Sequence, residues 1–473
     1  MDNQAFRSYA HEFVDWMADY LEQVENFPVK AQVEPGDIYR QIPEKAPLKG
    51  ESMAEIFIDF MKIILPGMTH WQSPNFFAYF PANSSYPSVL AEMLTATLGA
   101  QCMKWETSPA AAELEEKMMN WLKKMTGLPK HFQGVIQDSA STATLVAILN
   151  AREKHSEFQV NEKGLKWFDS FRVYCSTETH SSVEKAVKIA GIGSQNLVKV
   201  GVDDQFRLDP RLLKLAIESD LKVGNKPICV VATLGTTGAT AIDPLEEIAG
   251  ICSRYGIWLH VDAAFAGSAL ILPEFRWMIK GVEYADSFVF NPHKWLFTNF
   301  DCSAYFVKDK YSLLRTLQVV PEYLRTQDQG KVNDYCDWGV PLGRRFRSLK
   351  LWFVMRSFGT EALQEKLRLH IRLAHDLAEV IGQDIEFELM APVTLNLLCF
   401  RYKPTGIEDE KQLNEINEKL LKDINKTGLI YLTHTKLNGK YVLRMVIGQT
   451  NVEQRHVDEA WKLVQSSKFK VQS

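Results

Sequence analysis

The sequence predicts an α/β protein built around a mostly parallel sheet. From about residue 86 to residue 350, short apolar segments alternate with helical ones, which is typical of a parallel sheet covered by helices. In order they are FRVYCS, a helix near Ser182 to Ala190, ICVVATLG, a second helix, IWLHVDAA, FVFNPHKW and SAYFVK. The chain has 473 residues, about three times the roughly 150 residues of an average domain, so we expect further lobes beside this sheet.

The helix that follows ICVVATLG has clear start and stop signals. Asp243 is the expected N-cap, Pro244 suits the first helical position, and Gly256 stands just beyond the end. This punctuation places a helix between two strands, as a parallel sheet requires.

The two flanking regions differ from the central one. Apolar residues recur at helical spacing from Phe6 to Val24, and a second helical stretch runs from Ser52 to about Leu65. The VEPGDIYRQIPEKAPLKGE segment between them is too rich in proline and charge for regular structure. We therefore predict that residues 1–85 form an N-terminal arm, which cannot bury much surface alone and wraps the partner subunit of a homodimer.

Residues 351–473 are predicted to form a separate small α+β domain. They contain a long helix, an apolar strand near Val393 to Phe400, and a hairpin with a Leu-Asn-Gly-Lys turn between IYLTHT and YVLRMVIG. The large domain then spans residues 86–350.

Composition limits the class of protein. Net charge is only −4, which disfavours nucleic acid as the main partner. None of the seven cysteines forms a Cys-x-x-Cys pair, and Cys175, Cys229 and Cys399 lie in apolar strand-like runs, so a reducing, cytoplasmic location is expected. MDNQAFRSYA has no secretory pattern, and the longest nearly apolar run is interrupted by polar residues, so no membrane span is expected.

Several common catalytic motifs are missing from the sequence. It contains no G-x-G-x-x-G, Walker, H-E-x-x-H or G-x-S-x-G pattern, which disfavours hydride transfer, phosphoryl transfer, zinc hydrolysis and the serine-hydrolase elbow. No metal site is expected. Polar residues instead gather at the ends of the central strands, where open α/β sheets bind their ligands.

Four such positions stand out. Asp262 ends an apolar strand, and a buried carboxylate needs a positive or protonated partner. Lys294 follows another strand beside bulky apolar residues, which lower a lysine pKa and suit it to Schiff-base formation. An acid for a pyridinium nitrogen and an amine for an aldehyde are what a pyridoxal phosphate enzyme requires. GVIQDSASTATL supplies backbone N–H groups for a phosphate, although Ser139 and Ser141 are also ordinary N-caps. His180 either stacks on a cofactor ring or merely completes a turn.

Longer stretches carry a resemblance. NPHKW, HVDAAFAG, VATLGTT, HSSVE, HWQSPNFFAYFPANSSYPS and LGRRFRSLK closely resemble the aromatic L-amino-acid decarboxylases, group II pyridoxal phosphate enzymes of fold type I, the aspartate aminotransferase-like fold. The resemblance covers nearly the whole chain. It implies a homodimer with pyridoxal 5′-phosphate as its cofactor.

The resemblance also implies roles for individual residues. Lys294 would form the Schiff base, Asp262 would pair with the pyridinium nitrogen and keep it protonated, and Tyr323 would protonate the substrate carbon from the partner subunit. Other positions would bind the cofactor: the ring-stacking His180, Thr237 at the ring hydroxyl, Ala140, Ser141 and Asn291 at the phosphate, and Ala264 and His293. Tyr323 belongs to VVPEYLRTQDQGKVNDYCDW, a polar segment expected to form a mobile lid, where a tyrosine that only packs on closure is the alternative.

The same comparison bears on the reaction and the substrate. Relatives that make aldehydes typically replace the tyrosine at position 323 by phenylalanine or the histidine at position 180 by asparagine, so this chain is interpreted as a decarboxylase. Trp71, Tyr79 and Phe80 supply aromatic surface, and Gly343 leaves room for a large ring, which favours tryptophan, 5-hydroxytryptophan or dopa.

Four positions depart from the usual family pattern. Asp138 stands where glycine is usual beside the phosphate turn, Ala82 replaces a threonine, and Gln101 and Met103 replace apolar or aromatic pocket residues. The alternatives that stay open are an aromatic aldehyde synthase, a decarboxylase of histidine or tyrosine, and an inactive cofactor-binding interaction protein.

Overall fold

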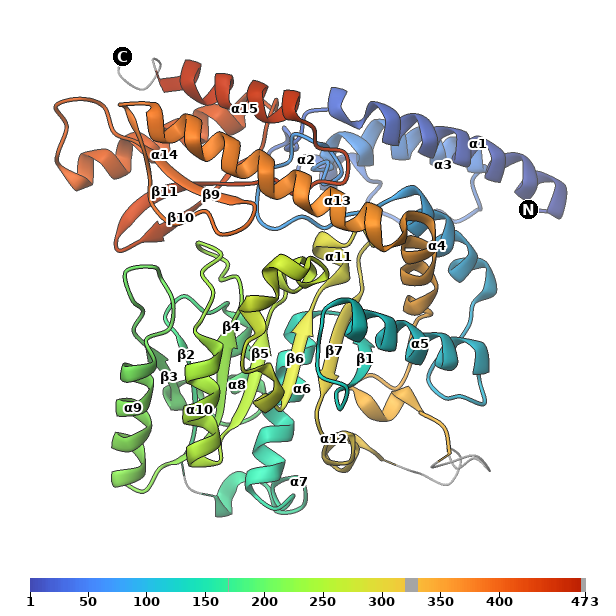
Figure 1. Ribbon diagram of the computed structural model, residues 1–473. Helices are drawn as coiled ribbons and strands as arrows, with labels where there is room; N and C mark the ends of the chain where they lie inside the picture. The colour runs from blue at the N-terminus through green and yellow to red at the C-terminus, as the bar shows by residue number, and fades with distance from the viewer. Residues whose placement is uncertain (169, 320–330, 469–473) are drawn as a thin grey trace. The chain divides into compact units, whose positions relative to one another are not determined.

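The computed structural model describes residues 1–168, 170–319 and 331–468, which form two compact units (Figure 1). The first unit combines Met1–Pro81, Arg372–Met390 and Asn396–Ser473. The second contains Ala82–Ile371 and Ala391–Leu395.

The second unit is built on a seven-stranded sheet with the order β1-β7-β6-β5-β4-β2-β3. Its strands are parallel except β7, which is antiparallel to both neighbours, so the predicted mostly parallel sheet is confirmed. The strands are β1 Gln133–Gln137, β2 Phe171–Ser176, β3 Leu197–Val200, β4 Lys226–Thr233, β5 Trp258–Asp262, β6 Ser287–Phe290 and β7 Ser303–Val307.

The central strands are apolar because helices cover both faces of the sheet. Every residue of β5, β6 and β7 is buried, as strands covered on both sides require. Helices α6 and α8 pack together on one face, and α9 and α10 pack together on the other (Figure 1). The helices are α4 Tyr86–Leu98, α5 Pro109–Met125, α6 Ala140–His155, α7 Val160–Lys163, α8 Ser182–Ile189, α9 Pro210–Lys222, α10 Leu245–Tyr255, α11 Pro292–Trp295 and α12 Lys310–Leu317.

The start of α10 differs from the prediction. Pro244 occupies the N-cap position and Gly256 ends the helix in the left-handed region at φ 66°, but Asp243 does not cap it. The Asp243 carboxylate is buried and accepts the backbone N–H of Leu208 at 2.8 Å and of Thr233 at 2.7 Å. These N–H groups lie 35 and 10 residues before Asp243, outside the first turn of the helix, so a local N-cap rule could not anticipate this role.

The first unit contains a four-stranded antiparallel sheet with the order β10-β11-β9-β8. The predicted hairpin is confirmed: Asn438 and Gly439 have φ of 50° and 79° between β10 and β11, as a type I′ turn requires. The elements are β8 Phe387–Leu389, β9 Leu397–Tyr402, β10 Thr433–Leu437, β11 Lys440–Val446, α14 Glu410–Lys426 and α15 Gln454–Ser467. The long helix α13, Arg347–Gln383, has a non-helical residue at Gly359 and runs from the second unit into the first.

The N-terminal residues belong to this first unit. Helix α1, Asn3–Gln23, and helix α3, Met53–Asp59, are joined by aromatic contacts, with ring centroids of Phe13 and Phe57 4.7 Å apart. The segments after α1 and α3 hydrogen-bond to the C-terminal residues: the Val29 N–H donates to the Gly428 carbonyl at 2.8 Å, and the Phe77 N–H to the Tyr431 carbonyl at 3.0 Å. The N-terminal segments therefore pack through hydrogen bonds to residues from the other end of the sequence.

The region between α1 and α3 was predicted to lack regular structure, and this was partly wrong. A short helix, α2 Asp37–Gln41, begins after Gly36, whose φ of 93° lies in the left-handed region. Asp37 forms an i,i+3 ion pair with Arg40 at 2.5 Å within it. Among the described residues, no helix is both long and apolar enough to cross a membrane.

Candidate active site

Six strands of the second unit, β1 to β6, run in the same direction and end at one edge of the sheet. β2, β4, β5 and β6 are parallel neighbours, and β1 has the same direction because β7 is antiparallel to both β1 and β6. The chain leaves this edge through Asp138, His180, Asp262 and Asn291. The sheet thus gathers the four sequence-predicted polar motifs at the carboxyl ends of its strands, where α/β sheets bind ligands.

Asp262 and Lys294 follow adjacent strands. Asp262 is the last residue of β5, is buried, and accepts the Ala264 N–H at 3.0 Å. Lys294 lies in α11, directly after β6, and is half-buried. Loss of hydration lowers the Lys294 pKa, and the negative charge of Asp262 partly opposes this shift. A lysine with a lowered pKa provides more of the neutral, nucleophilic amine at neutral pH.

The turn that carries Lys294 is rigidly held. The Cys302 N–H donates to Nδ1 of buried His293 at 2.9 Å, and the pKa of this ring is lowered to about 3, mainly by burial. Trp295 stacks on Phe265 with ring centroids 4.9 Å apart. The Asn83 side chain donates to the Lys294 carbonyl at 2.7 Å. These contacts fix the backbone of the lysine at the end of β6.

The predicted phosphate turn forms the N-terminus of α6. Ser139 caps the helix by accepting the Thr142 N–H at 3.2 Å, Ala140 begins it, and the side chain of Ser141 is exposed. Gln137, the last residue of β1, pairs with Ser303 of β7, and the Ser303 hydroxyl donates to the side-chain oxygen of Asn291. Sheet register therefore brings this helix start and buried Asn291 to the same edge.

His180 and Thr237 are both exposed. The Ser182 N–H can only donate, and it lies 3.2 Å from Nδ1 of His180, so Nδ1 accepts and the ring proton is on Nε2. Partial loss of hydration lowers the His180 pKa, against the opposing charge of Asp262. Thr237 lies in the loop that Gly235 closes by donating its N–H to the Ala241 carbonyl at 2.9 Å.

The predicted substrate residues fall in both units. In the first, Trp71 stacks on exposed Tyr79 with ring centroids 5.8 Å apart, and the guanidinium of Arg444 lies 5.6 Å from the Phe80 ring. In the second are Ala82, Gln101, Met103 and Gly343.

Gln101 and Gly343 lie next to each other. A Cβ added at Gly343 would lie 3.1 Å from the Gln101 side-chain nitrogen, while the Gln101 side-chain oxygen accepts the Arg344 N–H at 2.7 Å. The Met103 carbonyl accepts the Cys336 N–H at 2.9 Å nearby. Gln101, Met103 and the 336–344 segment are thus brought together, whereas Tyr323 lies outside the described residues.

The structure adds residues that the sequence interpretation missed. His260 lies two residues before Asp262 on β5 and is fully buried. Its Nδ1 is 2.9 Å from the Ser287 hydroxyl, and its Nε2 is 3.3 Å from the Thr144 hydroxyl. Burial lowers its pKa to about 4, so its ring is neutral at neutral pH. Asn83 was also missed, and Asp243 was assigned only a role as an N-cap. The only sequence signal for His260 is its position two residues before Asp262, because the residues that it contacts are distant in the sequence.

These residues fit pyridoxal phosphate. The chemistry of three groups tests the fit: a lysine with a lowered pKa and a buried carboxylate follow adjacent strands, and a helix N-terminus lies at the same edge of the sheet. Lys294 would hold the aldehyde, Asp262 the pyridinium nitrogen, and Ala140, Ser141 and Asn291 the phosphate. No group of three or more His, Cys, Asp or Glu in the described part of the chain could hold a metal ion.

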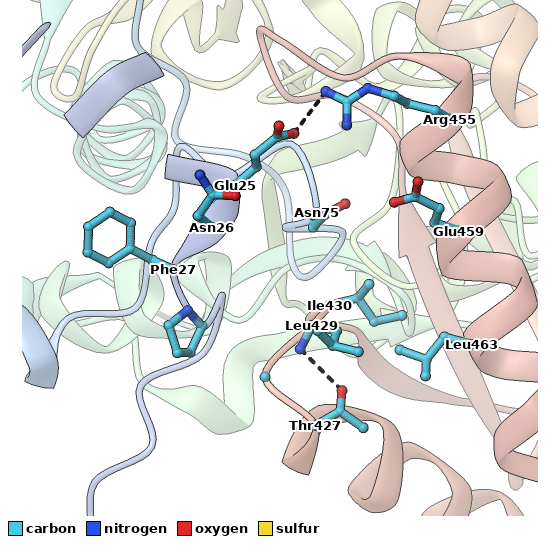
Figure 2. A pocket seen from close by; sticks show the side chains of 12 residues that line it. Glu25, Asn26, Phe27, Asn75, Thr427, Leu429, Ile430, Arg455, Glu459 and Leu463 are labelled. Carbon is cyan, nitrogen blue, oxygen red and sulfur yellow. Dashed lines mark hydrogen bonds and ion pairs between the residues drawn. The ribbon is translucent and has the colours of Figure 1, made fainter. Parts of the chain in front are cut away.

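A separate cavity of about 420 Å³ lies in the first unit (Figure 2). Glu25, Arg455 and Leu463 contribute to its wall, and Glu25 forms an ion pair with Arg455 at 2.9 Å and a contact with His456 at 2.9 Å. None of the candidate site residues lines this cavity. It is therefore distinct from the strand-end site.

Comparison with known proteins shows the family of the chain. Residues 35–403 match the pyridoxal-dependent decarboxylase conserved domain. Phenylacetaldehyde synthase of Arabidopsis thaliana is 45% identical, covering 98% of this chain and 96% of that protein, and tyrosine decarboxylase of Papaver somniferum is 43% identical, covering 98% and 94%. The crystal structure of Oryza sativa tryptophan decarboxylase with pyridoxal phosphate and tryptamine superposes with a TM-score of 0.97 at 35% identity, covering 100% and 99%. The chain belongs to the pyridoxal-dependent decarboxylase family.

Proposed function

We propose that this protein decarboxylates aromatic L-amino acids to the corresponding arylalkylamines and carbon dioxide. The observation that carries the proposal is the placement of Lys294 and Asp262 at the ends of adjacent strands, in a chain 43% to 45% identical to enzymes named for aromatic substrates and products. Tryptophan, 5-hydroxytryptophan and dopa are the proposed substrates, because Trp71, Tyr79 and Phe80 offer aromatic surface.

The residues divide the chemistry between them. When bound, pyridoxal phosphate supplies an electron sink for the electron pair that remains after carbon dioxide leaves. Lys294 provides the amine that holds the aldehyde, and its lowered pKa favours the neutral form. The Asp262 carboxylate holds a proton at the pyridine nitrogen. His180 presents a flat neutral ring with its proton on Nε2. Tyr323 is proposed to deliver a proton to the substrate carbon.

Aromatic aldehyde synthesis is the alternative that the comparisons raise. The 45% identity to a phenylacetaldehyde synthase exceeds the 43% identity to a tyrosine decarboxylase by too little to decide between amine and aldehyde. Tyr323 and His180 favour the amine, because aldehyde-forming relatives typically replace one of them. The deciding experiment measures amine, aldehyde and peroxide from purified holoenzyme; aldehyde and peroxide in amounts equal to the carbon dioxide would establish the alternative.

We further propose a cytoplasmic homodimer that the arm helps to form. All seven cysteines are buried and free, which suits a reducing compartment. On α1 and α3 the apolar side chains of Phe6, Ile56 and Ile58 are 59%, 45% and 48% exposed. Exposed apolar residues gathered on one pair of helices are typical of a subunit interface.

Changing two of these side chains tests the dimer. The double variant Ile56→Glu and Ile58→Glu should be monomeric by light scattering coupled to size exclusion, because it places two charges in the proposed interface. The control is Asp59→Asn at an exposed position of the same helix. A double variant that remains as dimeric as this control would contradict the proposed role of the arm.

A further inference from the structure

Asp138 lies in the turn that leads from β1 into α6. Its carboxylate accepts the Ser139 N–H at 2.8 Å, and the same oxygen is 3.5 Å from the Ser139 hydroxyl. The side chain is half-buried. Because Gln137 pairs with Ser303, whose hydroxyl donates to Asn291, Asp138 stands on the side of the sheet edge where the phosphate is proposed to bind.

The charge of this carboxylate is only partly balanced. The negative charge of Asp138 contributes to raising the pKa of Arg347, so the two side chains attract each other. That guanidinium, however, makes its two hydrogen bonds to the carboxylate of Asp301, each at 3.0 Å. Within the described residues, Asp138 itself takes part in no ion pair within 4.0 Å.

A carboxylate at this place acts against a phosphate in two ways. It occupies the Ser139 N–H, which precedes the free N–H groups of the α6 N-terminus. It also adds a negative charge beside a group that carries almost two negative charges at neutral pH, and like charges repel across a partly hydrated site. Both effects weaken phosphate binding without touching the cofactor ring.

We propose that Asp138 weakens the binding of the cofactor through its phosphate, so that the loaded fraction of this enzyme follows the concentration of free pyridoxal phosphate. This inference rests on the proposed phosphate turn at Ala140 and Ser141. Asp138 thereby lowers the affinity for the cofactor, and it need not contact the substrate.

Equilibrium binding to the cofactor-free protein tests the proposal. Asp138→Asn keeps the size of the side chain and removes its charge, and Asp138→Gly removes the side chain; Asp204→Asn, at an exposed loop position, is the matched control. Each protein is titrated with pyridoxal phosphate and with pyridoxal, which lacks the phosphate, and binding is followed by protein fluorescence at low and high salt.

The two Asp138 variants should bind pyridoxal phosphate about 10-fold more tightly than the wild type, the order expected for one charge near a phosphate. Pyridoxal affinity should not change, and the gain should shrink in high salt because salt screens the repulsion. Unchanged affinity for pyridoxal phosphate, or equal tightening for pyridoxal, would overturn the proposal. Failure of wild-type protein to form a reducible linkage at Lys294 with either compound would instead contradict the proposed function, on which the proposal depends.

Discussion

A buried ion pair next to the strand that leads into the phosphate turn allows a prediction about the free energy of unfolding. Glu115 of α5 and Arg344 are 2.7 Å apart, with side chains only 3% and 7% exposed. The same Glu115 oxygen accepts the Ile136 N–H of β1 at 2.8 Å, and the same Arg344 nitrogen donates to the Ile136 carbonyl at 2.7 Å. One pair of charges therefore ties α5, β1 and the 344 region together.

The perturbation is Glu115→Gln, which keeps the side-chain shape and removes the charge. The variant leaves the Arg344 guanidinium buried without its counter-ion, and breaking such a pair costs about 3 kcal/mol of unfolding free energy. If the dependence of that free energy on urea is about 3 kcal/mol per molar, the midpoint of unfolding should fall by about 1 M.

Urea unfolding of cofactor-free protein, followed by circular dichroism, measures the effect. The control is the same substitution at Glu184, which pairs with Lys188 at 2.7 Å and Lys199 at 3.2 Å on the surface and should leave the midpoint unchanged. If Glu115→Gln lowers the midpoint no more than Glu184→Gln does, the reasoning about the buried pair is refuted.

Three further predictions concern chemistry and pH. Borohydride reduction followed by peptide mapping should place the pyridoxyl label on Lys294. A label on any other lysine would contradict the proposal that Lys294 binds the cofactor aldehyde. Tyr323→Phe should lower amine formation by about 100-fold or more and shift the product toward aldehyde, ammonia and peroxide, because one general acid is lost. If the variant forms amine at the wild-type rate without peroxide, Tyr323 is not the proton donor and only packs in the lid. Burial lowers the folded-state pKa of His260 to about 4, below about 6.5 in the unfolded chain, so its contribution to stability is present above pH 6.5 and lost as pH falls toward 4. At pH 5.5 this loss is about 1.4 kcal/mol, and urea unfolding of His260→Gln should show a correspondingly weaker pH dependence than wild type; identical pH profiles would contradict it.

The sequence predicted those features that have local or periodic signals. The apolar runs of β4, β5 and β6 and the helical segments between them indicate a parallel sheet, and its strand ends place Asp262 and Lys294 at one edge. The Asn438-Gly439 turn is equally local, because only the turn residues need a positive φ. These elements are determined by a few neighbouring residues.

Long-range contacts explain what the sequence did not reveal. Asp243 resembles an N-cap because it precedes Pro244, but it satisfies buried N–H groups of Leu208 and Thr233, which only the folded sheet brings near. His260 likewise gained its partners Thr144 and Ser287 from other elements. Tertiary hydrogen bonds decide both roles, and no pattern within one segment encodes them.

The most direct test of the central claim is product analysis with a panel of amino acids. Purified holoenzyme is supplied with L-tryptophan, L-tyrosine, L-dopa, L-histidine and L-glutamate, and carbon dioxide, amine, aldehyde and peroxide are measured together. We expect equal amounts of carbon dioxide and arylalkylamine from at least one aromatic substrate, none from glutamate, and loss of multiple turnover in Lys294→Ala. Absence of carbon dioxide from every aromatic amino acid would contradict the account.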